Sequence, residues 1–123
     1  MTSQTILKVL RVFRSASLTR NLNTDVLHKL AAMSSELAFK EDQIIYRAGD
    51  IGESIYIVES GQVVIERDVP DHAPVTIHTL GPGQSFGWSS IYPHERWSAT
   101  ARAAKPTRVI AIKADRIRKS LWS

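Results

Sequence analysis

Apolar side chains near the N-terminus recur at helical spacing. Residues 4–14 present them on one face, three or four positions apart; these are Ile6, Val9, Leu10 and Phe13. Residues 23–37 predict a second helix, with Asn23 or Thr24 as its N-cap and Asp25 in the first turn, where the helix dipole favours a negative charge. The pattern therefore predicts two helices ahead of the rest of the chain.

The central part of the chain changes to the alternation typical of strands. Residues 41–68 are rich in β-branched and aromatic residues, and Ile55 and Ile57 alternate with Tyr56 and Val58. The stretch ESGQ at 59–62 predicts a tight turn into VVIE at 63–66, so we expect these two strands to pair as a hairpin. Further strands are predicted at 75–80, 98–103 and 107–113.

An irregular segment and a last helix complete the pattern. Residues 81–87 should be irregular, because a proline lacks an amide donor and glycines permit positive φ. Residues 114–123 predict a helix capped by Asp115, with Ile117 and Leu121 on one face. The chain ends after about two turns of this helix, so we expect another segment or a partner to continue or dock there.

Several short strands between terminal helices predict a mainly β fold, a small antiparallel roll or barrel. We expect one domain over residues 1–123, because 43% hydrophobic residues suffice for a core and 23% charged residues are ordinary for a globular protein. Within it we expect N-terminal helices over 1–38, a β-roll over 39–113 and the start of a C-terminal helix over 114–123.

Composition and charge exclude several classes of protein. Without cysteine, the chain has no disulfides, thiolate metal sites or thiol chemistry. The net charge of +4 is concentrated at the ends: residues 1–20 carry four basic and no acidic side chains, and residues 96–119 carry eight basic side chains against Asp115. No DNA-binding or RNA-binding pattern accompanies this charge, so we interpret it as solvated helix faces. Basic residues interrupt the N-terminal apolar run, which argues against a signal peptide or membrane span and leads us to expect a cytoplasmic protein.

No pattern of catalytic or metal-binding residues stands out. GPGQSFG at 81–87 departs from the dinucleotide-binding fingerprint, and GWSSI at 87–91 lacks the second glycine of a nucleophile elbow. The four histidines form no close pair, and the predicted strands lack the His and Glu clusters of β-roll metalloenzymes. We therefore expect no enzyme, no metal site and no cofactor apart from a small-molecule ligand.

Four stretches of the chain resemble a known family. The stretches are IIYRAGDIGESIYIVESGQVVIERD at 44–68, LGPGQSFG at 80–87, WSATARA at 97–103 and TRVIAI at 107–112. Together they resemble the cyclic nucleotide-binding domain, the sensor module of the CRP/FNR regulators and of cyclic nucleotide-regulated kinases and channels. The resemblance covers roughly residues 18–121. It implies an antiparallel, jelly-roll-like double-stranded β-helix with a phosphate-binding cassette at 81–100.

The family's cassette holds a cyclic phosphate with a short helix, an acidic residue and an arginine. The helix directs backbone N–H groups at the phosphate, the acidic residue binds a ribose hydroxyl, and the arginine neutralises the phosphate. The resemblance matches Gly87 to the cassette glycine and places Ser89 and Ser90 in the short helix. It places Trp88 at the acidic position and Trp97 at the arginine position, so both charged contacts are missing.

The loss of both contacts disfavours ordinary cAMP or cGMP binding. A hydrogen bond to a charged group contributes roughly 1.5–3 kcal/mol. Two lost bonds cost on the order of 3–6 kcal/mol, or about two to four decades of affinity. We therefore expect a regulatory ligand-sensing module that is degenerate for cAMP and cGMP and works through its terminal helices. The two indoles would either fill the pocket as core or act as plates that stack a planar ligand.

Two alternatives remain. One is a genuine cyclic nucleotide sensor that uses Arg96, Ser98, Thr100 and the backbone of residues 87–90. Because strand neighbours face opposite sides, Arg96 would need a bulge to reach the pocket. The other is a scaffold or oligomerisation domain. The candidate pocket residues are Phe86, Gly87, Trp88, Ser89, Ser90, Arg96, Trp97, Ser98 and Thr100.

The resemblance also implies what kinds of partner to expect. The ligand would be a small molecule, either a cyclic nucleotide or another planar compound. A protein partner or a second copy would bind through the terminal helices. We expect no direct DNA binding, because the winged DNA-reading half of a CRP-like regulator is absent from these 123 residues.

Overall fold

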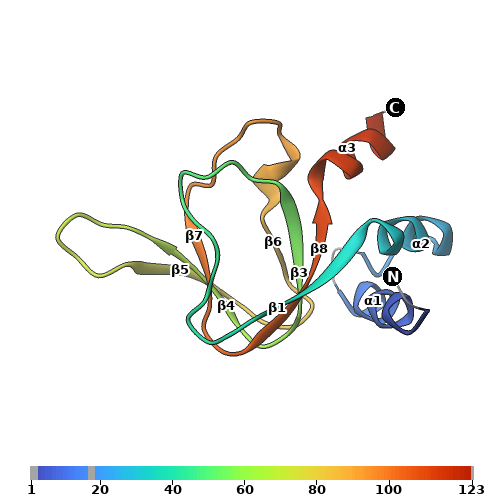
Figure 1. Ribbon diagram of the computed structural model, residues 1–123, viewed down its shortest axis with the longest axis horizontal. Helices are drawn as coiled ribbons and strands as arrows, with labels where there is room; N and C mark the ends of the chain where they lie inside the picture. Colours follow the sequence, from blue (N-terminus) through green and yellow to red (C-terminus); the bar gives the residue numbers. More distant parts are fainter. Residues whose placement is uncertain (1–2, 17–18, 123) are drawn as a thin grey trace.

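The computed structural model describes residues 3–16 and 19–122. Its helices are α1 (Ser3–Ser15), α2 (Thr24–Ala32), the 3-10 helix η1 (Trp88–Ile91) and α3 (Ala114–Trp122). Its strands are β1 (Ser34–Phe39), β2 (Ile44–Tyr46), β3 (Ser54–Ser60), β4 (Val63–Arg67), β5 (Val75–Leu80), β6 (Ser85–Phe86), β7 (Thr100–Ala103) and β8 (Thr107–Lys113). Figure 1 shows the strands in the middle, α1, α2 and α3 at one end, and the β4–β5 hairpin reaching out at the other.

The described strands form two antiparallel sheets. One has the order β1-β8-β3-β6 and the other β2-β7-β4-β5. A core of apolar side chains from both sheets lies between them: Val58, Val63, Ile65, Phe86, Ala99, Ala101 and Val109. Non-consecutive strands are neighbours in both sheets, as in a jelly roll. The predicted class, a mainly β antiparallel roll with flanking helices, is confirmed.

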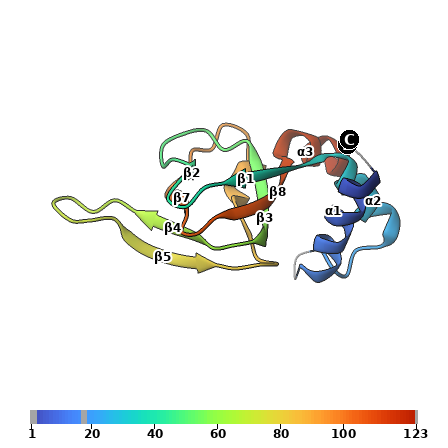
Figure 2. The same ribbon diagram turned by 60° about the horizontal axis from the view of Figure 1, so that its bottom comes forward.

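The sheet that contains β3 and β8 is covered on both faces. Residues Ile55 and Ile57 pack towards the helices, while Val58 faces the other sheet. This is the period-two alternation predicted for 55–58. On the helix side, Val9 and Phe13 are fully buried, which confirms the predicted stripe of α1. The side chain of Ile6 lies outside the described residues. Figure 2 shows that this helical layer lies at the opposite end of the molecule from the β4–β5 hairpin.

The second predicted helix is too long. It begins at Thr24, with the Asn23 side chain accepting from the Val26 amide at 2.9 Å, but it ends at Ala32. The Ser34 hydroxyl donates to the Ala31 carbonyl at 2.8 Å and satisfies one of the last carbonyls of the helix. The chain then forms β1, which pairs with β8 along its whole length. The β-roll therefore begins at Ser34 and not at residue 39.

The predicted hairpin across 59–62 is wrong. Strand β3 pairs with β8 and β6, whereas β4 pairs with β5 and β7. The turn exists, but it carries the chain from one sheet to the other. Gly61 has φ +95°, and a Cβ there would lie 2.4 Å from the Pro106 carbonyl oxygen. A left-handed residue without a side chain is therefore required at this corner.

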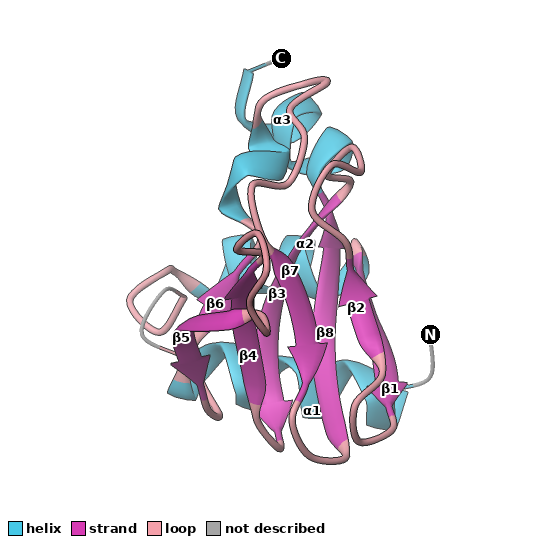
Figure 3. Ribbon diagram, turned by 90° about the vertical axis from the view of Figure 1, so that its left-hand side faces the viewer, coloured by secondary structure: helices cyan, strands magenta, loops and turns pink. Residues whose placement is uncertain are grey.

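The C-terminal part of the roll differs from the prediction in small ways. The segment 81–87, predicted to be irregular, contains the two-residue strand β6, although Gly83 and Gly87 have positive φ as expected. Strand β7 begins at Thr100 and not at residue 98. Figure 3 shows α3 at the far end of β8, which it follows directly in the chain.

Helix α3 begins at Ala114, two residues earlier than a cap at Asp115 would require. Asp115 lies in the first turn, behind Ala114, and so does not cap the helix from outside. Ile117 is buried as predicted, and the side chain of Leu121 lies outside the described residues. Among the helices of the described ranges, none combines the length and apolarity needed to cross a lipid bilayer.

Candidate functional site

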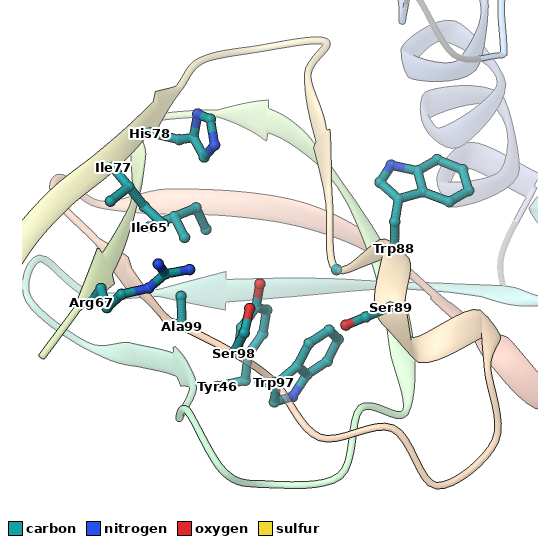
Figure 4. Close-up of a pocket in the computed structure, with 11 residues that line it drawn as sticks. Tyr46, Ile65, Arg67, Ile77, His78, Trp88, Ser89, Trp97, Ser98 and Ala99 are labelled. Atoms are coloured by element: carbon teal, nitrogen blue, oxygen red, sulfur yellow. The ribbon is translucent and has the colours of Figure 1, made fainter.

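A cavity of about 270 Å³ lies between the β4–β5 hairpin, β2 and the start of η1 (Figure 4). Its polar lining residues are Tyr46, Arg67, His78, Ser89 and Ser98. The remaining lining residues are Ile65, Ile77, Gly87, Trp88, Trp97 and Ala99. The lining of the cavity is therefore mixed, and polar groups make up the larger part of its surface.

Trp97 fills the part of the site beside Gly87. The residue is 6% exposed, and its ring stacks on Tyr46 with the ring centroids 3.9 Å apart. A Cβ on Gly52 would lie 2.9 Å from Cζ2 and Cη2 of this indole, and a Cβ on Gly87 would lie 3.3 Å from Cη2. The benzene part of the ring is thus wedged between two glycines. Its backbone is held as well, because its N–H donates to the Asp50 carbonyl at 2.8 Å.

Trp88 lies at the rim and does not fill the cavity. It is 42% exposed, and its indole N–H donates to the Ser85 hydroxyl at 3.0 Å. In η1 the fully buried Ser90 faces inward, its hydroxyl donating to the Gly87 carbonyl at 2.7 Å. Because a 3-10 helix has three residues per turn, Trp88 leaves η1 on another side. The expectation that both indoles plug the pocket is therefore wrong for Trp88.

Arg96 lies outside the cavity lining. Its guanidinium is exposed and donates to the Gly49 carbonyl at 2.7 Å, and its backbone forms an isolated bridge with Ile51. Its neighbour Trp97 points inward, as the alternation of an extended chain requires. The register shift that would bring Arg96 into the cavity is not present.

The other predicted site residues divide into two groups. Gly87, Ser89 and Ser98 line the cavity together with the two tryptophans. Phe86 is buried and stacks on Tyr56, with the ring centroids 4.9 Å apart. The Thr100 hydroxyl accepts from the Ala48 amide at 3.0 Å. Phe86, Ser90 and Thr100 therefore support the site without lining it.

The β4–β5 hairpin contributes residues that the sequence analysis did not select. Ile65 and Arg67 lie on one face of β4, and both line the cavity. Glu66, between them, points the other way and accepts from Arg102 at 2.7 Å. The alternation along 63–67 indicated that Ile65 and Arg67 lie on the same face of the strand. Which face borders the cavity, however, depends on how the two sheets pack.

A β-bulge brings two successive residues of β5 to the cavity. Ile65 pairs with His78 and Glu66 with Thr76, so Ile77 is the extra residue. As a result, both Ile77 and His78 line the cavity. Strict alternation along the strand would have excluded one of them, so sequence pattern alone could not find this pair.

Tyr46 and Arg67 determine much of the electrostatic character of the cavity. Burial raises the pKa of the Tyr46 hydroxyl well above its ordinary value, so this group stays neutral beside the Trp97 ring. Within the described ranges, no three His, Asp or Glu side chains gather in a way that would hold a metal ion. Arg67 supplies the permanent charge among the described residues that line the cavity.

Helix α3 is tied directly to η1. The Arg118 guanidinium donates to the Ser90 carbonyl at 2.8 Å and to the Ile91 carbonyl at 3.2 Å. These carbonyls lie at the C-terminal end of η1, where cations are favoured. A displacement of η1 would therefore strain or break a contact with the C-terminal helix.

Two bacterial proteins are similar to this chain in sequence. The chain is 32% identical over 97 residues to the CRP-like cAMP-activated global transcriptional regulator of Mycobacterium tuberculosis, covering 76% of this chain and 42% of the regulator. It is 30% identical over 95 residues to the cyclic AMP receptor protein of Thermus thermophilus, covering 71% and 44%. The chain thus spans less than half the length of these relatives.

A solved structure shares the fold, and a family model matches most of the chain. The structure matches the regulatory subunit of a cAMP-independent protein kinase A from Trypanosoma brucei with a TM-score of 0.86 at 18% identity, over 96% of this chain and 43% of that one. Residues 36–121 match the model of the cyclic nucleotide-binding domain. This chain therefore belongs to the cyclic nucleotide-binding domain family.

Proposed function

We propose that this domain is a ligand-sensing regulatory module whose pocket is not adapted to a cyclic phosphate. One observation carries the proposal: the Trp97 indole is wedged between Gly52 and Gly87, beside the start of the short helix that would bind the phosphate. An indole offers one neutral N–H donor and no positive charge. It therefore cannot neutralise a phosphate as a guanidinium would.

The energy needed to move this ring supports the proposal. A buried tryptophan removes about 150–250 Å² from water, which corresponds to roughly 4–6 kcal/mol at about 25 cal/mol per Å². A ligand that displaced the ring would lose much of this energy in addition to the two missing charged contacts. A loss at the upper end of this range, about 6 kcal/mol, would abolish binding even at a site with a micromolar dissociation constant.

A genuine cyclic nucleotide sensor is the second candidate. The names of the two bacterial relatives, each of which refers to cAMP, favour it. The kinase regulatory subunit described as cAMP-independent illustrates that the fold is not restricted to cAMP-dependent proteins. Such a sensor would have to hold its ligand without Arg96, which lies outside the cavity.

The output of the module is proposed to be α3. Arg118 couples this helix to η1, so a ligand that moves Trp97 and Gly87 would also change the contacts of Arg118. A protein partner or a second copy of the chain would then bind through the terminal helices.

Calorimetry with cAMP and cGMP tests the proposal. We expect dissociation constants weaker than about 10 μM at physiological salt for the wild type, because both charged contacts are absent. Replacing Trp97→Arg together with Trp88→Glu should create or strengthen cAMP binding by about two decades or more, since it restores both. Trp88→Glu alone is the matched comparison: it restores only the acidic position and leaves the Trp97 ring beside Gly87, so it should bind cAMP more weakly than the double variant. Tight binding of cAMP by the wild type would contradict the proposed function.

A further inference from the structure

We infer that the cavity binds a small planar monoanion of the aromatic carboxylate class, with its carboxylate on Arg67 and its ring beside Trp97. This inference rests on the proposed function, because it requires Trp97 to stay beside Gly87. The acidic group of the ligand would then lie at the β4–β5 hairpin, on the opposite side of the cavity from the family's phosphate position.

The charge of the cavity selects an anion. Among the eleven described residues that line it there is no carboxylate, and Arg67 supplies the permanent charge. Figure 4 shows the Arg67 guanidinium extending from the hairpin between Ile65 and Ala99. Within residues 3–16 and 19–122, Arg67 has no ion-pair partner, whereas Arg102 and Arg108 each bind two carboxylates. Arg67 is therefore available to a ligand.

The amount of charge favours a carboxylate over a phosphate monoester. A planar guanidinium matches the two oxygens of one carboxylate with parallel hydrogen bonds. A phosphate monoester carries almost two negative charges at neutral pH, and no second permanent cation is present among the described lining residues. Hydrogen-bonding side chains also line the cavity, namely His78, Ser89 and Ser98. They can bind the edges of a ligand without requiring more charge on it.

The shape of the cavity favours a flat ligand. Its volume of about 270 Å³ lies just below the usual range for ligand sites, about 300–1,000 Å³, so one or two fused rings fit best. Aliphatic side chains of Ile65 and Ile77 line one side of the cavity. Figure 4 shows Tyr46 on the side of the Trp97 indole that faces these residues, and the two rings are stacked with their centroids 3.9 Å apart. The stacked pair offers a rigid surface. Flat apolar rings pack well on such a surface.

Titration of simple aromatic carboxylates tests the inference. The probes are benzoate and indole-3-carboxylate, and benzamide and indole-3-carboxamide are their uncharged analogues. Chemical shifts of the Trp97 indole N–H, assigned with Trp97→Phe, report occupancy. We expect carboxylate dissociation constants on the order of a millimolar, as is usual for ligands this small, and at least about tenfold weaker binding of the amides.

Three variants isolate the role of Arg67. Arg67→Gln should weaken carboxylate binding by about tenfold to a hundredfold, because a charged hydrogen bond is lost. Arg67→Lys should retain part of the affinity. Arg47→Gln changes the net charge equally at an exposed position outside the cavity lining and should leave binding unchanged. Thermal unfolding checks that each variant is folded.

The outcomes separate this inference from the proposed function. Equal binding of amides and carboxylates would overturn it and indicate a site for neutral rings. No shift in the wild type up to about 10 mM carboxylate, or unchanged binding in Arg67→Gln, would overturn it as well. The proposed function would survive each of these results. Tight cAMP binding in the same samples would instead contradict the proposed function.

Discussion

Trp97 and the two glycines beside it form the central packing unit of the site. The ring contacts Gly52 and Gly87 on its benzene edge and Tyr46 on its face. A close-packed interior tolerates little added volume, so each of these positions restricts the others. A change at Gly52 is therefore a way to measure how firmly the ring is held.

We expect Gly52→Ala to destabilise the domain by about 1–3 kcal/mol, because the new methyl group would lie 2.9 Å from Trp97. Trp97→Ala alone should cost about 3–5 kcal/mol through the cavity it leaves. In the double variant the clash with the indole is absent and the Ser90 Cβ at 3.1 Å remains as the close contact, so the two costs should not add. Denaturant unfolding of all four proteins measures this coupling. Additive costs would mean that the ring does not rest against Gly52.

Helix α3 is held to η1 by hydrogen bonds from the Arg118 side chain. Arg118 binds two carbonyls of η1 and is half-buried, so part of its hydrogen-bond energy is shielded from water. The remaining contact of α3 with the domain is apolar, with Ile117 buried. The position of α3 should therefore respond to a single substitution.

Arg118→Met keeps the length of the side chain and removes its donors. We expect faster amide hydrogen exchange in residues 114–119, corresponding to a local loss of about 1.5–3 kcal/mol, because a charged hydrogen bond is removed. Arg116→Met, at an exposed position of the same helix, should leave exchange nearly unchanged. If both variants exchange alike, Arg118 does not couple α3 to η1.

On the scale of the whole molecule, an ion-pair cluster joins the helical layer to the sheet. Glu36 of β1 contacts Lys8 of α1 and Arg108 of β8, and Glu59 of β3 contacts the same two cations. Both carboxylate side chains are largely buried, at 12% and 10% exposure. The cluster thus links three strands and a helix whose residues are far apart in the chain.

The stability of the domain should therefore depend on acid. Hydrogen bonding by Arg108, aided by Lys8 and opposed by burial, lowers the pKa of Glu36 in the folded protein. A lowered folded pKa stabilises the fold above the unfolded pKa, and this contribution is lost as the pH falls through the folded value. Glu36→Gln should therefore cost about 1 kcal/mol at pH 7 and clearly less at pH 3, below the ordinary pKa of a glutamate.

Denaturant unfolding at both pH values measures this difference. Glu53→Gln serves as the control, because its side chain is 75% exposed and lies 3.7 Å from Lys113. A cost of Glu36→Gln that is the same at pH 7 and pH 3 would contradict the assigned role of the carboxylate.

Features that depend on neighbours in the chain were predictable. Alternation over 55–58 identified a strand, and helical spacing identified the buried faces of Val9 and Phe13. The turn at Gly61 was predicted correctly, but its strand partners were not, because the pairing of β3 and β4 depends on residues far along the chain. The roles of Gly87 and Trp97 as neighbours in the site followed from the family resemblance.

The amino-acid sequence by itself determined the class of fold and the turn at Gly61, because these depend on local pattern and local backbone freedom. Its family resemblance added the expectation that Trp88 and Trp97 stand at the two charged positions of the cassette. Only the tertiary structure decided that Trp97 is buried while Trp88 is not, and that Arg67 reaches the cavity while Arg96 does not. The reason is physical: the direction of a side chain relative to a cavity depends on how the two sheets pack and where a bulge shifts the register.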